Sequence, residues 1–195
     1  MTLSGLPAEV LSALAGAPVL AILGFIGLRQ WRRRRARRAL LAQMAAVAAD
    51  FVQDVLLPDG NGGTFHVDFL LFTGAGIVVA DLRDVPGLIY GSDHMDEWTV
   101  MDKTRRATFP NPLGPLYDRM AAVRLLAGEG VPVDGRVVFS DRGSFPKGHP
   151  KAVTRLGSLA RELPPRTAGE AMLTQLQPAW ERVKAATQPS DLRRH

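Results

Sequence analysis

The sequence predicts a mixed α/β domain, with a β-sheet flanked by helices, preceded by one transmembrane helix. The 195 residues suffice for one domain with a real hydrophobic core and an appendage. Short apolar runs that end in turn signals occur together with longer segments of helical spacing, which indicates strands and helices in one domain. Residues 10–28 carry no charge at all, which indicates a membrane span.

The composition excludes several classes of protein. The chain has no cysteine, which rules out a disulfide scaffold, a thiolate zinc site and a cysteine nucleophile. Its net charge is +5, but seven of its 24 basic residues lie within residues 29–38. Because Glu9 is the one acidic residue before that segment, residues 39–195 hold 17 basic and 18 acidic residues, a net charge of −1. The high isoelectric point therefore does not by itself indicate nucleic-acid binding.

The first predicted element is the transmembrane helix 10–28, which would be about 28 Å long, close to the hydrocarbon thickness of a bilayer. An Arg-rich stop-transfer segment, 29–38, follows it, and residues 1–9 before it contain only Glu9. The positive-inside rule then makes 1–9 a short extracytoplasmic N-terminus and places the domain in the cytoplasm, in a single-pass protein of the inner (plasma) membrane. The arginines that set this topology are Arg29, Arg32, Arg33, Arg34 and Arg35. Arginines also suit contacts with nucleic acid, although their position beside the span favours the topology signal.

The strands follow a helical continuation at residues 36–49, predicted from its helix-forming composition. Each strand is an apolar run bounded by turn residues or by a polar loop. The predicted strands are residues 51–57, 65–72, 77–82, 88–90, 97–101 and 136–140.

Three helices are predicted in the cytoplasmic part. Asn111 and Pro112 open the first, as cap and first helical residue, and Gly128 ends it. The other two are predicted at residues 151–162 and 167–187, and Pro178 is expected to kink or divide the last one. The domain is accordingly placed at residues 39–165, and the C-terminal helix and tail at 166–195.

Charged residues that could bind a metal ion or take part in catalysis flank the Gly-rich turn 73–76. If the hairpin is centred within this turn, Asp68 faces Asp81, His66 faces Arg83, and all four side chains share one face of the strand pair. Two opposed carboxylates repel each other unless a cation lies between them, and Mg²⁺ takes one or two carboxylates together with water and phosphate oxygens. Such a metal activates water and neutralises charge on a phosphodiester, which Arg83 could hold.

The same charged residues also fit a salt-bridge cluster without metal, and spacing alone does not distinguish the two. His66 is more typical of a structural hydrogen-bonder than of a ligand. The acidic loop around His94 could hold a second cation, although a solvated loop explains it as well.

The segment from His66 to Ser140 resembles the nuclease-related domain (NERD) family, a branch of the PD-(D/E)xK nuclease-like fold. The family pattern is an Asp on one strand, a Gly in the turn and Glu-x-Lys on the next strand. Asp68, Gly76 and Asp81-Leu-Arg83 stand at these places. Downstream, four further segments of the chain resemble family motifs: GLIYG at 87–91, Trp98, FPNPL at 109–113 and VVFS at 137–140.

The resemblance implies a restriction-endonuclease-like mixed sheet and metal-dependent hydrolysis of DNA or RNA. Asp68 and Asp81 would be the Mg²⁺ (or Mn²⁺) ligands, and Asp68, Asp81 and Arg83 the catalytic residues. Some family positions differ: Asp81 replaces a Glu, Arg83 replaces a Lys and cannot act as a base, and Pro115 stands where the family has a Gln.

These observations are compatible with three functions. The first is a membrane-anchored, metal-dependent nuclease. The second is a degenerate member of the family that binds nucleic acid or a protein at the membrane, and the third is a membrane-tethered assembly protein. In the third case the arginines and the amphipathic face of the last helix, around Leu176 and Trp180, would make the contacts.

Overall fold

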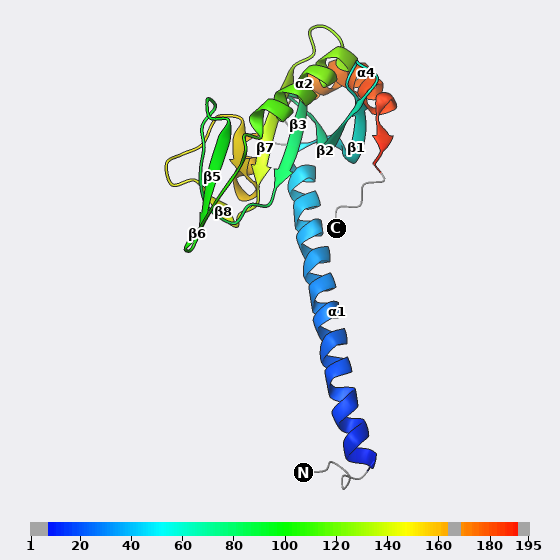
Figure 1. The fold of residues 1–195 in the computed structure, drawn as a ribbon. Helices are drawn as coiled ribbons and strands as arrows, with labels where there is room; N and C mark the ends of the chain where they lie inside the picture. Colours follow the sequence, from blue (N-terminus) through cyan, green and yellow to red (C-terminus); the bar gives the residue numbers. More distant parts are fainter. Residues whose placement is uncertain (1–7, 164–168, 191–195) are drawn as a thin grey trace. The chain divides into compact units, whose positions relative to one another are not determined.

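The computed structural model describes the backbone of residues 8–163 and 169–190, and their side chains from Gly24 onward except for that of Arg33. The chain divides into two compact units, residues 1–42 and 43–195. Helix α1 (Ala8–Val47) makes up the described part of the first unit and its last turn belongs to the second (Figure 1). The helical continuation predicted at residues 36–49 is confirmed as far as Val47.

Only part of the predicted membrane span lies within the described residues. The N-terminus 1–9 and most of the span 10–28 fall outside the residues whose side chains are described, as does Arg33. Within the part that is described, no helix has an apolar stretch long enough to cross a membrane. In this first unit the guanidinium carbon of Arg35 lies 5.5 Å from the centre of the exposed Trp31 ring, close enough for a cation–π contact.

The larger of two sheets in the second unit has six strands in the order β10-β1-β2-β3-β7-β9. The pairs from β10 to β3 are antiparallel, whereas β7 runs parallel to β3 and β9 parallel to β7. The strands are β1 (Asp50–Pro58), β2 (Thr64–Thr73), β3 (Gly76–Arg83), β7 (Val133–Phe139), β9 (Val153–Arg155) and β10 (Gln188–Pro189). The mixed sheet predicted from the sequence is confirmed. Strands β1, β2 and β3 contain the predicted ranges 51–57, 65–72 and 77–82.

The second sheet has four strands in the order β6-β5-β4-β8. They are β4 (Gly87–Tyr90), β5 (Glu97–Asp102), β6 (Arg105–Pro110) and β8 (Gly143–Ser144). The sequence did not indicate β6, because Arg105 and Arg106 lack the apolar alternation of a strand and its turn from β5 contains no glycine. Lys103 takes the left-handed conformation in that turn, with φ of 54°.

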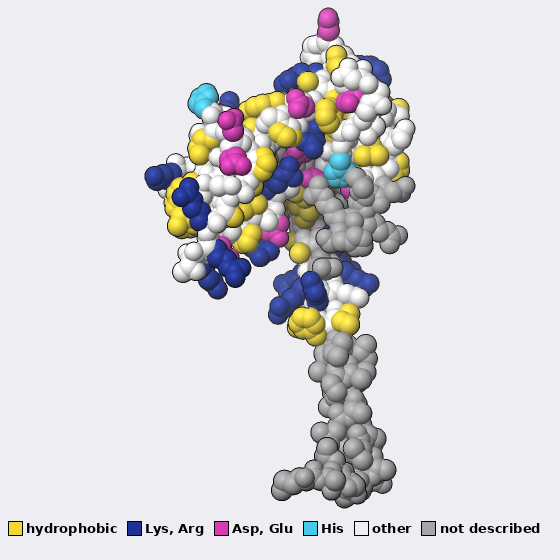
Figure 2. All heavy atoms as spheres, in the orientation of Figure 1, with side chains coloured by type: hydrophobic (Ala, Val, Ile, Leu, Met, Phe, Trp, Pro, Cys, Tyr) yellow, Lys and Arg dark blue, Asp and Glu magenta, His cyan; other side chains and the backbone are white. Residues whose placement is uncertain are grey.

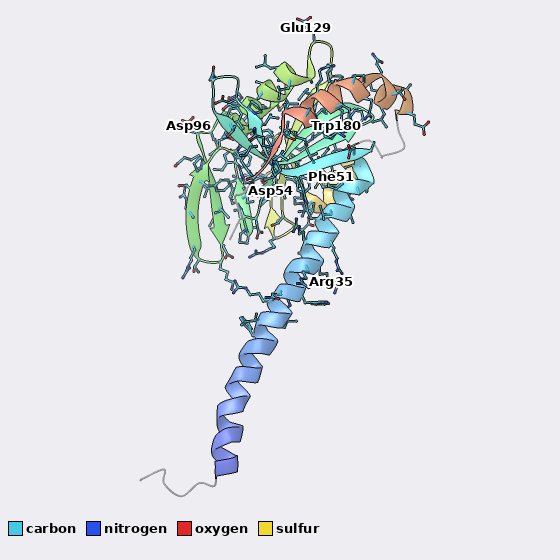
Figure 3. The ribbon with its side chains drawn as sticks, turned by 90° about the vertical axis from the view of Figure 1, so that its right-hand side faces the viewer. Arg35, Phe51, Asp54, Asp96, Glu129 and Trp180 are labelled. Carbon is cyan, nitrogen blue, oxygen red and sulfur yellow. The ribbon has the colours of Figure 1, made fainter. Side chains whose placement is uncertain are left out.

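Helices α2 (Leu113–Ala127) and α4 (Glu170–Ala186) join the core of the six-stranded sheet. Helix α2 begins one residue later than predicted, with Pro112 as its cap residue, although the Oδ1 of Asn111 still accepts the N–H of Leu113 at 3.0 Å. It ends before Gly128 as predicted, and Gly128 has φ of 91°. Trp180 lies on α4 (Figure 3) and is completely buried. Its ring is stacked on Phe72, with 5.4 Å between centroids. A mixed α/β fold with a helix-flanked sheet is thus confirmed.

The helix predicted at 167–187 is confirmed by α4 (Glu170–Ala186), whereas the one predicted before it needs correction. The helix predicted at 151–162 is wrong in its first part, where Val153 and Thr154 are buried in β9, and helical structure begins only at η1 (Leu156–Ser158) and α3 (Leu159–Glu162). Both residues are β-branched and pair with β7, which favours strand over helix. Pro178 does not divide α4, where both Pro178 and Thr174, the residue whose carbonyl loses its N–H partner, are exposed.

Candidate active site

The hairpin of β2 and β3 has the register that the turn predicted. Phe69 pairs with Ala80, Leu70 with Val79 and Thr73 with Gly76. The next pair in this register is Asp68 and Asp81, and there the backbone ladder ends. The N–H of Leu82 instead donates to Asp68 Oδ2 at 2.7 Å, so the Asp68 side chain replaces a backbone acceptor at the point where the strands separate.

The face that carries the two carboxylates is the face of the main core. Leu70 and Val79, the neighbouring pair on that face, are fully buried within it. Asp68 and Asp81 lie at its edge and are themselves 7% and 1% exposed. Burial of an ionised carboxylate is costly unless a cation or hydrogen-bond donors surround it. The fold must therefore supply partners to both.

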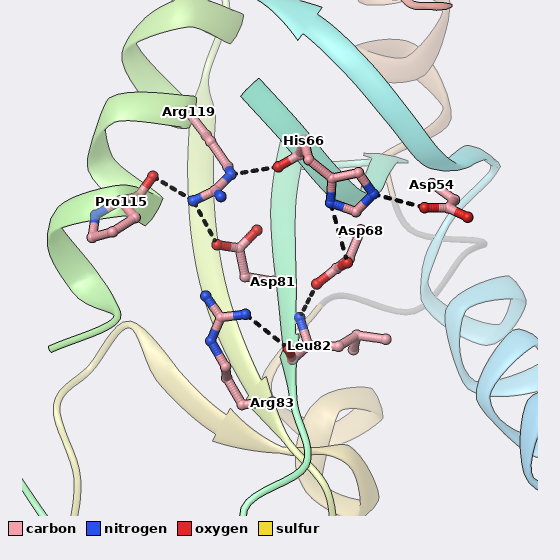
Figure 4. Close-up of polar contacts among 8 residues, drawn as sticks. All are labelled: Asp54, His66, Asp68, Asp81, Leu82, Arg83, Pro115 and Arg119. Carbon is pink, nitrogen blue, oxygen red and sulfur yellow. Dashed lines mark hydrogen bonds and ion pairs between the residues drawn. The ribbon is translucent and has the colours of Figure 1, made fainter. Parts of the chain in front are cut away.

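Asp81 receives its partner from helix α2. Arg119 Nη1 lies 3.1 Å from Asp81 Oδ2 and donates to the carbonyl of Pro115 at 2.8 Å, and Nε donates to the carbonyl of His66 at 2.6 Å (Figure 4). Arg119 was not predicted as a site residue. A signal was present: Arg119 is three residues after Leu116 and four before Val123, so a cation stands on the apolar face of an amphipathic helix.

Asp68 has a histidine beside it. His66 Nδ1 lies 3.8 Å from Asp68 Oδ1, and Nε2 lies 2.7 Å from Asp54 Oδ1 (Figure 4). Asp54 has a positive φ of 56° and stands in β1 opposite Asp68, between ladder pairs that continue on both sides of it. His66 thus links two carboxylates on neighbouring strands, in agreement with a hydrogen-bonding role. Asp54 was not singled out from the sequence.

Arg83 is the third predicted site residue. It is half-buried at the end of β3, and its Nη1 donates to the carbonyl of Leu82 at 3.2 Å. Its guanidinium lies on the same side of the strand as the Asp81 carboxylate (Figure 4). The structure therefore brings Asp68, Asp81 and Arg83 together with two residues that were not predicted, Arg119 and Asp54.

The donor set suits a hard divalent cation in type but is small. Asp68 and Asp81 are carboxylates on adjacent strands, and oxygen donors of this kind are those that Mg²⁺ and Mn²⁺ take in proteins. In the described part of the chain, no three His, Asp or Glu side chains are arranged to hold a metal ion. An ion here would depend on the two carboxylates together with water and substrate oxygens, which is a usual Mg²⁺ arrangement.

The acidic loop around His94 is held by hydrogen bonds from neutral groups. The Nδ2 of Asn111 donates to the carbonyl of Met95 at 2.8 Å, and the Nε1 of Trp98 donates to the carbonyl of Ser92 at 3.1 Å. Asn111 and Trp98 lie within the motifs that resemble the NERD family. Their side chains order this loop, which is a structural role.

Comparisons with known proteins agree with the family resemblance seen in the sequence. Residues 30–140 match the family profile described as nuclease-related domain (NERD), which is more than half of the chain. An uncharacterized protein from Bacillus anthracis is 25% identical over 84 residues, which cover 43% of this chain and 40% of that protein. The matched segment thus spans less than half the length of this relative. No solved structure matches the chain.

Proposed function

This chain belongs to the nuclease-related domain (NERD) family, and on that premise we propose that it hydrolyses phosphodiester bonds of DNA or RNA with the help of a divalent metal ion. The observation that carries the proposal is the pair of buried carboxylates, Asp68 and Asp81, on adjacent strands with Arg83 two residues further along the same face. Two carboxylates that hold a divalent metal ion, beside the guanidinium of Arg83, suit a substrate that is itself an anion.

Each residue would have a distinct part in this reaction. Asp68 and Asp81 would hold Mg²⁺ or Mn²⁺, which supplies an activated water and neutralises charge on the phosphate. Arg83 would bind a phosphate oxygen pair, since a guanidinium presents parallel N–H donors. Arg83 keeps its proton at any physiological pH, so it orients the substrate and does not accept a proton from the attacking water.

The turn between β5 and β6 offers cations for the rest of the nucleic acid. Lys103, Arg105 and Arg106 are all exposed there, and Figure 2 shows dark-blue side chains at that end of the four-stranded sheet. Residues 39–195 have a net charge of only −1, so phosphate contacts depend on local clusters of this kind. This supports a nucleic acid as the substrate and partner of the domain.

Cleavage by the full-length chain tests the proposal. The purified protein is incubated with Mn²⁺ or Mg²⁺ and with supercoiled DNA, linear DNA or single-stranded RNA. We expect metal-dependent cleavage of at least one substrate and none in the presence of EDTA. A folded protein that leaves all three substrates intact would contradict the proposed activity.

One observation favours an alternative without hydrolysis. Arg119 already neutralises Asp81, and Arg83 cannot serve as a base, so the fold is also suited to bind a nucleic acid or a protein and leave it uncut. In the same incubation this alternative predicts that labelled nucleic acid is retained, in a salt-sensitive manner, without loss of length.

We further propose that α1 anchors the domain at the inner (plasma) membrane, with the N-terminus outside and the domain in the cytoplasm. The uncharged residues 10–28 and the arginines that follow from Arg29 support this orientation. A reporter fused to the C-terminus should be active only in the cytoplasm, and the protein should stay with the membrane fraction in high salt. Periplasmic activity of the reporter would disprove the orientation, and release by salt would disprove the span.

A further inference from the structure

Given the metal-dependent function proposed for this site, we infer that Arg119 is the built-in counter-cation of Asp81, and that a divalent ion binds this carboxylate only in competition with Arg119. Without metal, Arg119 would balance the charge of Asp81, and it would set the affinity of this carboxylate for a metal ion. Arg119 touches Asp81 and not the reacting atoms, so it is a positioning residue.

The contacts of Arg119 show that it is part of the fold and not a loosely placed surface side chain. Its guanidinium donates to two backbone carbonyls, those of Pro115 and His66, as well as to Asp81. The side chain is 17% exposed and that of Asp81 is 2% exposed. Hydrogen bonds to fixed backbone atoms on a helix and on a strand hold the charge in place before any ligand arrives.

Charge explains why this arrangement opposes a metal. A divalent ion bound to Asp81 would lie within a few ångströms of a guanidinium that cannot lose its proton. The two cations repel each other and seek the same carboxylate, and with Asp81 buried there is little water to screen the repulsion. Metal binding must therefore move Arg119 from Asp81 or proceed with weakened affinity.

The sequence of α2 gives the competition a structural origin. Pro115, in the first turn of α2, has no side-chain donor. Arg119 lies one helical turn further on, at i+4, on the same side of the helix, and it reaches Asp81 while binding the Pro115 carbonyl. A permanent cation thus approaches the acidic pair from α2.

Metal binding to the full-length protein tests the inference directly. Mn²⁺ affinity is measured by titration with detection of free Mn²⁺ by electron paramagnetic resonance, and the melting temperature is recorded in EDTA and in Mn²⁺. We expect Arg119→Gln to lower the melting temperature in EDTA, to bind Mn²⁺ about tenfold or more tightly than the parent, and to regain much of the lost melting temperature on metal addition.

Three variants make this result specific. Arg119→Lys keeps a positive charge and should bind Mn²⁺ less tightly than Arg119→Gln. Arg124→Gln, which removes an exposed arginine from the same helix, should leave the affinity unchanged. The double variant Arg119→Gln/Asp81→Asn should lose the gain in affinity and regain stability in EDTA, because the buried charge is removed with its partner.

Two results would overturn the inference: a folded Arg119→Gln protein that binds Mn²⁺ no more tightly than the parent, or an equal gain in the double variant. Neither measurement requires cleavage. If no variant cuts nucleic acid but Arg119→Gln gains Mn²⁺ affinity through Asp81, the proposed hydrolysis fails and the competition stands. If the parent cuts and Arg119→Gln gains no affinity, the competition alone fails.

Discussion

Replacing Trp180 by Ala is expected to lower the free energy of unfolding by about 3–5 kcal/mol, the usual cost of truncating a fully buried tryptophan. Trp180 has no exposed surface, its ring lies on Phe72 of β2, and its Nε1 donates to Asp50 Oδ2 at 2.8 Å. One side chain thus joins α4 to the core and to the beginning of β1. Urea unfolding followed by circular dichroism measures the loss.

A Trp180→Phe variant separates packing from the hydrogen bond. Burial alone would raise the pKa of Asp50, but hydrogen bonds from Trp180 and Lys184 outweigh it and hold this pKa below its ordinary value of 3.8. A lowered pKa in the folded protein adds stability above the ordinary value, and this stability is lost as the pH falls through the lowered pKa. Trp180→Phe should therefore be less stable than the parent at neutral pH, and the difference should shrink below about pH 4.

The outcome also tests how firmly α4 is packed into the domain. The sequence allowed its amphipathic face to be a surface for a partner, but Leu176, Ala179, Trp180 and Val183 are all buried in the domain core. That use of the helix is therefore wrong for this structure. An unchanged unfolding free energy for Trp180→Ala would instead mean that α4 can leave the domain without cost.

The sequence predicted the site geometry where the contacts are local. The turn 73–76 sets the register of β2 and β3, and the register sets the face and the neighbours of Asp68 and Asp81. The approach of Arg119 to Asp81 could not be predicted, because it depends on how α2 crosses β3, 38 residues apart in the chain. No local pattern specifies such a crossing, although an arginine on an apolar helix face marks a position that needs a buried partner.

A similar distinction explains the errors in the fold. Residues 151–162 have helical composition only in part. The strand conformation of Val153 and Thr154 is set by their pairing with β7, which lies earlier in the chain. In contrast, the capping residue Asn111 and the terminating Gly128 are local signals, and α2 begins and ends where they place it to within two residues. The local signals at the two ends of α2 were thus reliable, whereas the pairing of β9 with β7 could not be predicted from the residues of β9 alone.

The change Asp68→Asn is expected to reduce metal-dependent cleavage on the order of 10³-fold, because the loss of a metal ligand removes several kcal/mol of charge stabilisation. An asparagine has the same shape, and its side-chain oxygen can still accept the Leu82 N–H that Asp68 binds at 2.7 Å. The fold should therefore persist, which an alanine at this position would not ensure. Cleavage is measured as the initial rate in Mn²⁺, with the melting temperature recorded for each variant.

Asp134→Asn provides the matched control, since Asp134 lies on β7 of the same sheet but is exposed and pairs with Arg136. It should cut at the parental rate. Equal cleavage by Asp68→Asn and the parent would place the activity outside the acidic pair or in a contaminating nuclease.

The opposite result has a consequence for the chemistry of the site. If cleavage is lost in Asp68→Asn and retained in Asp134→Asn, the acidic pair at the end of β2 and β3 performs the reaction. It would do so even though Asp-x-Arg stands where the family pattern has Glu-x-Lys. A permanently charged arginine would then suffice at position 83, and the proton of the attacking water would have to leave by a route that does not involve that residue.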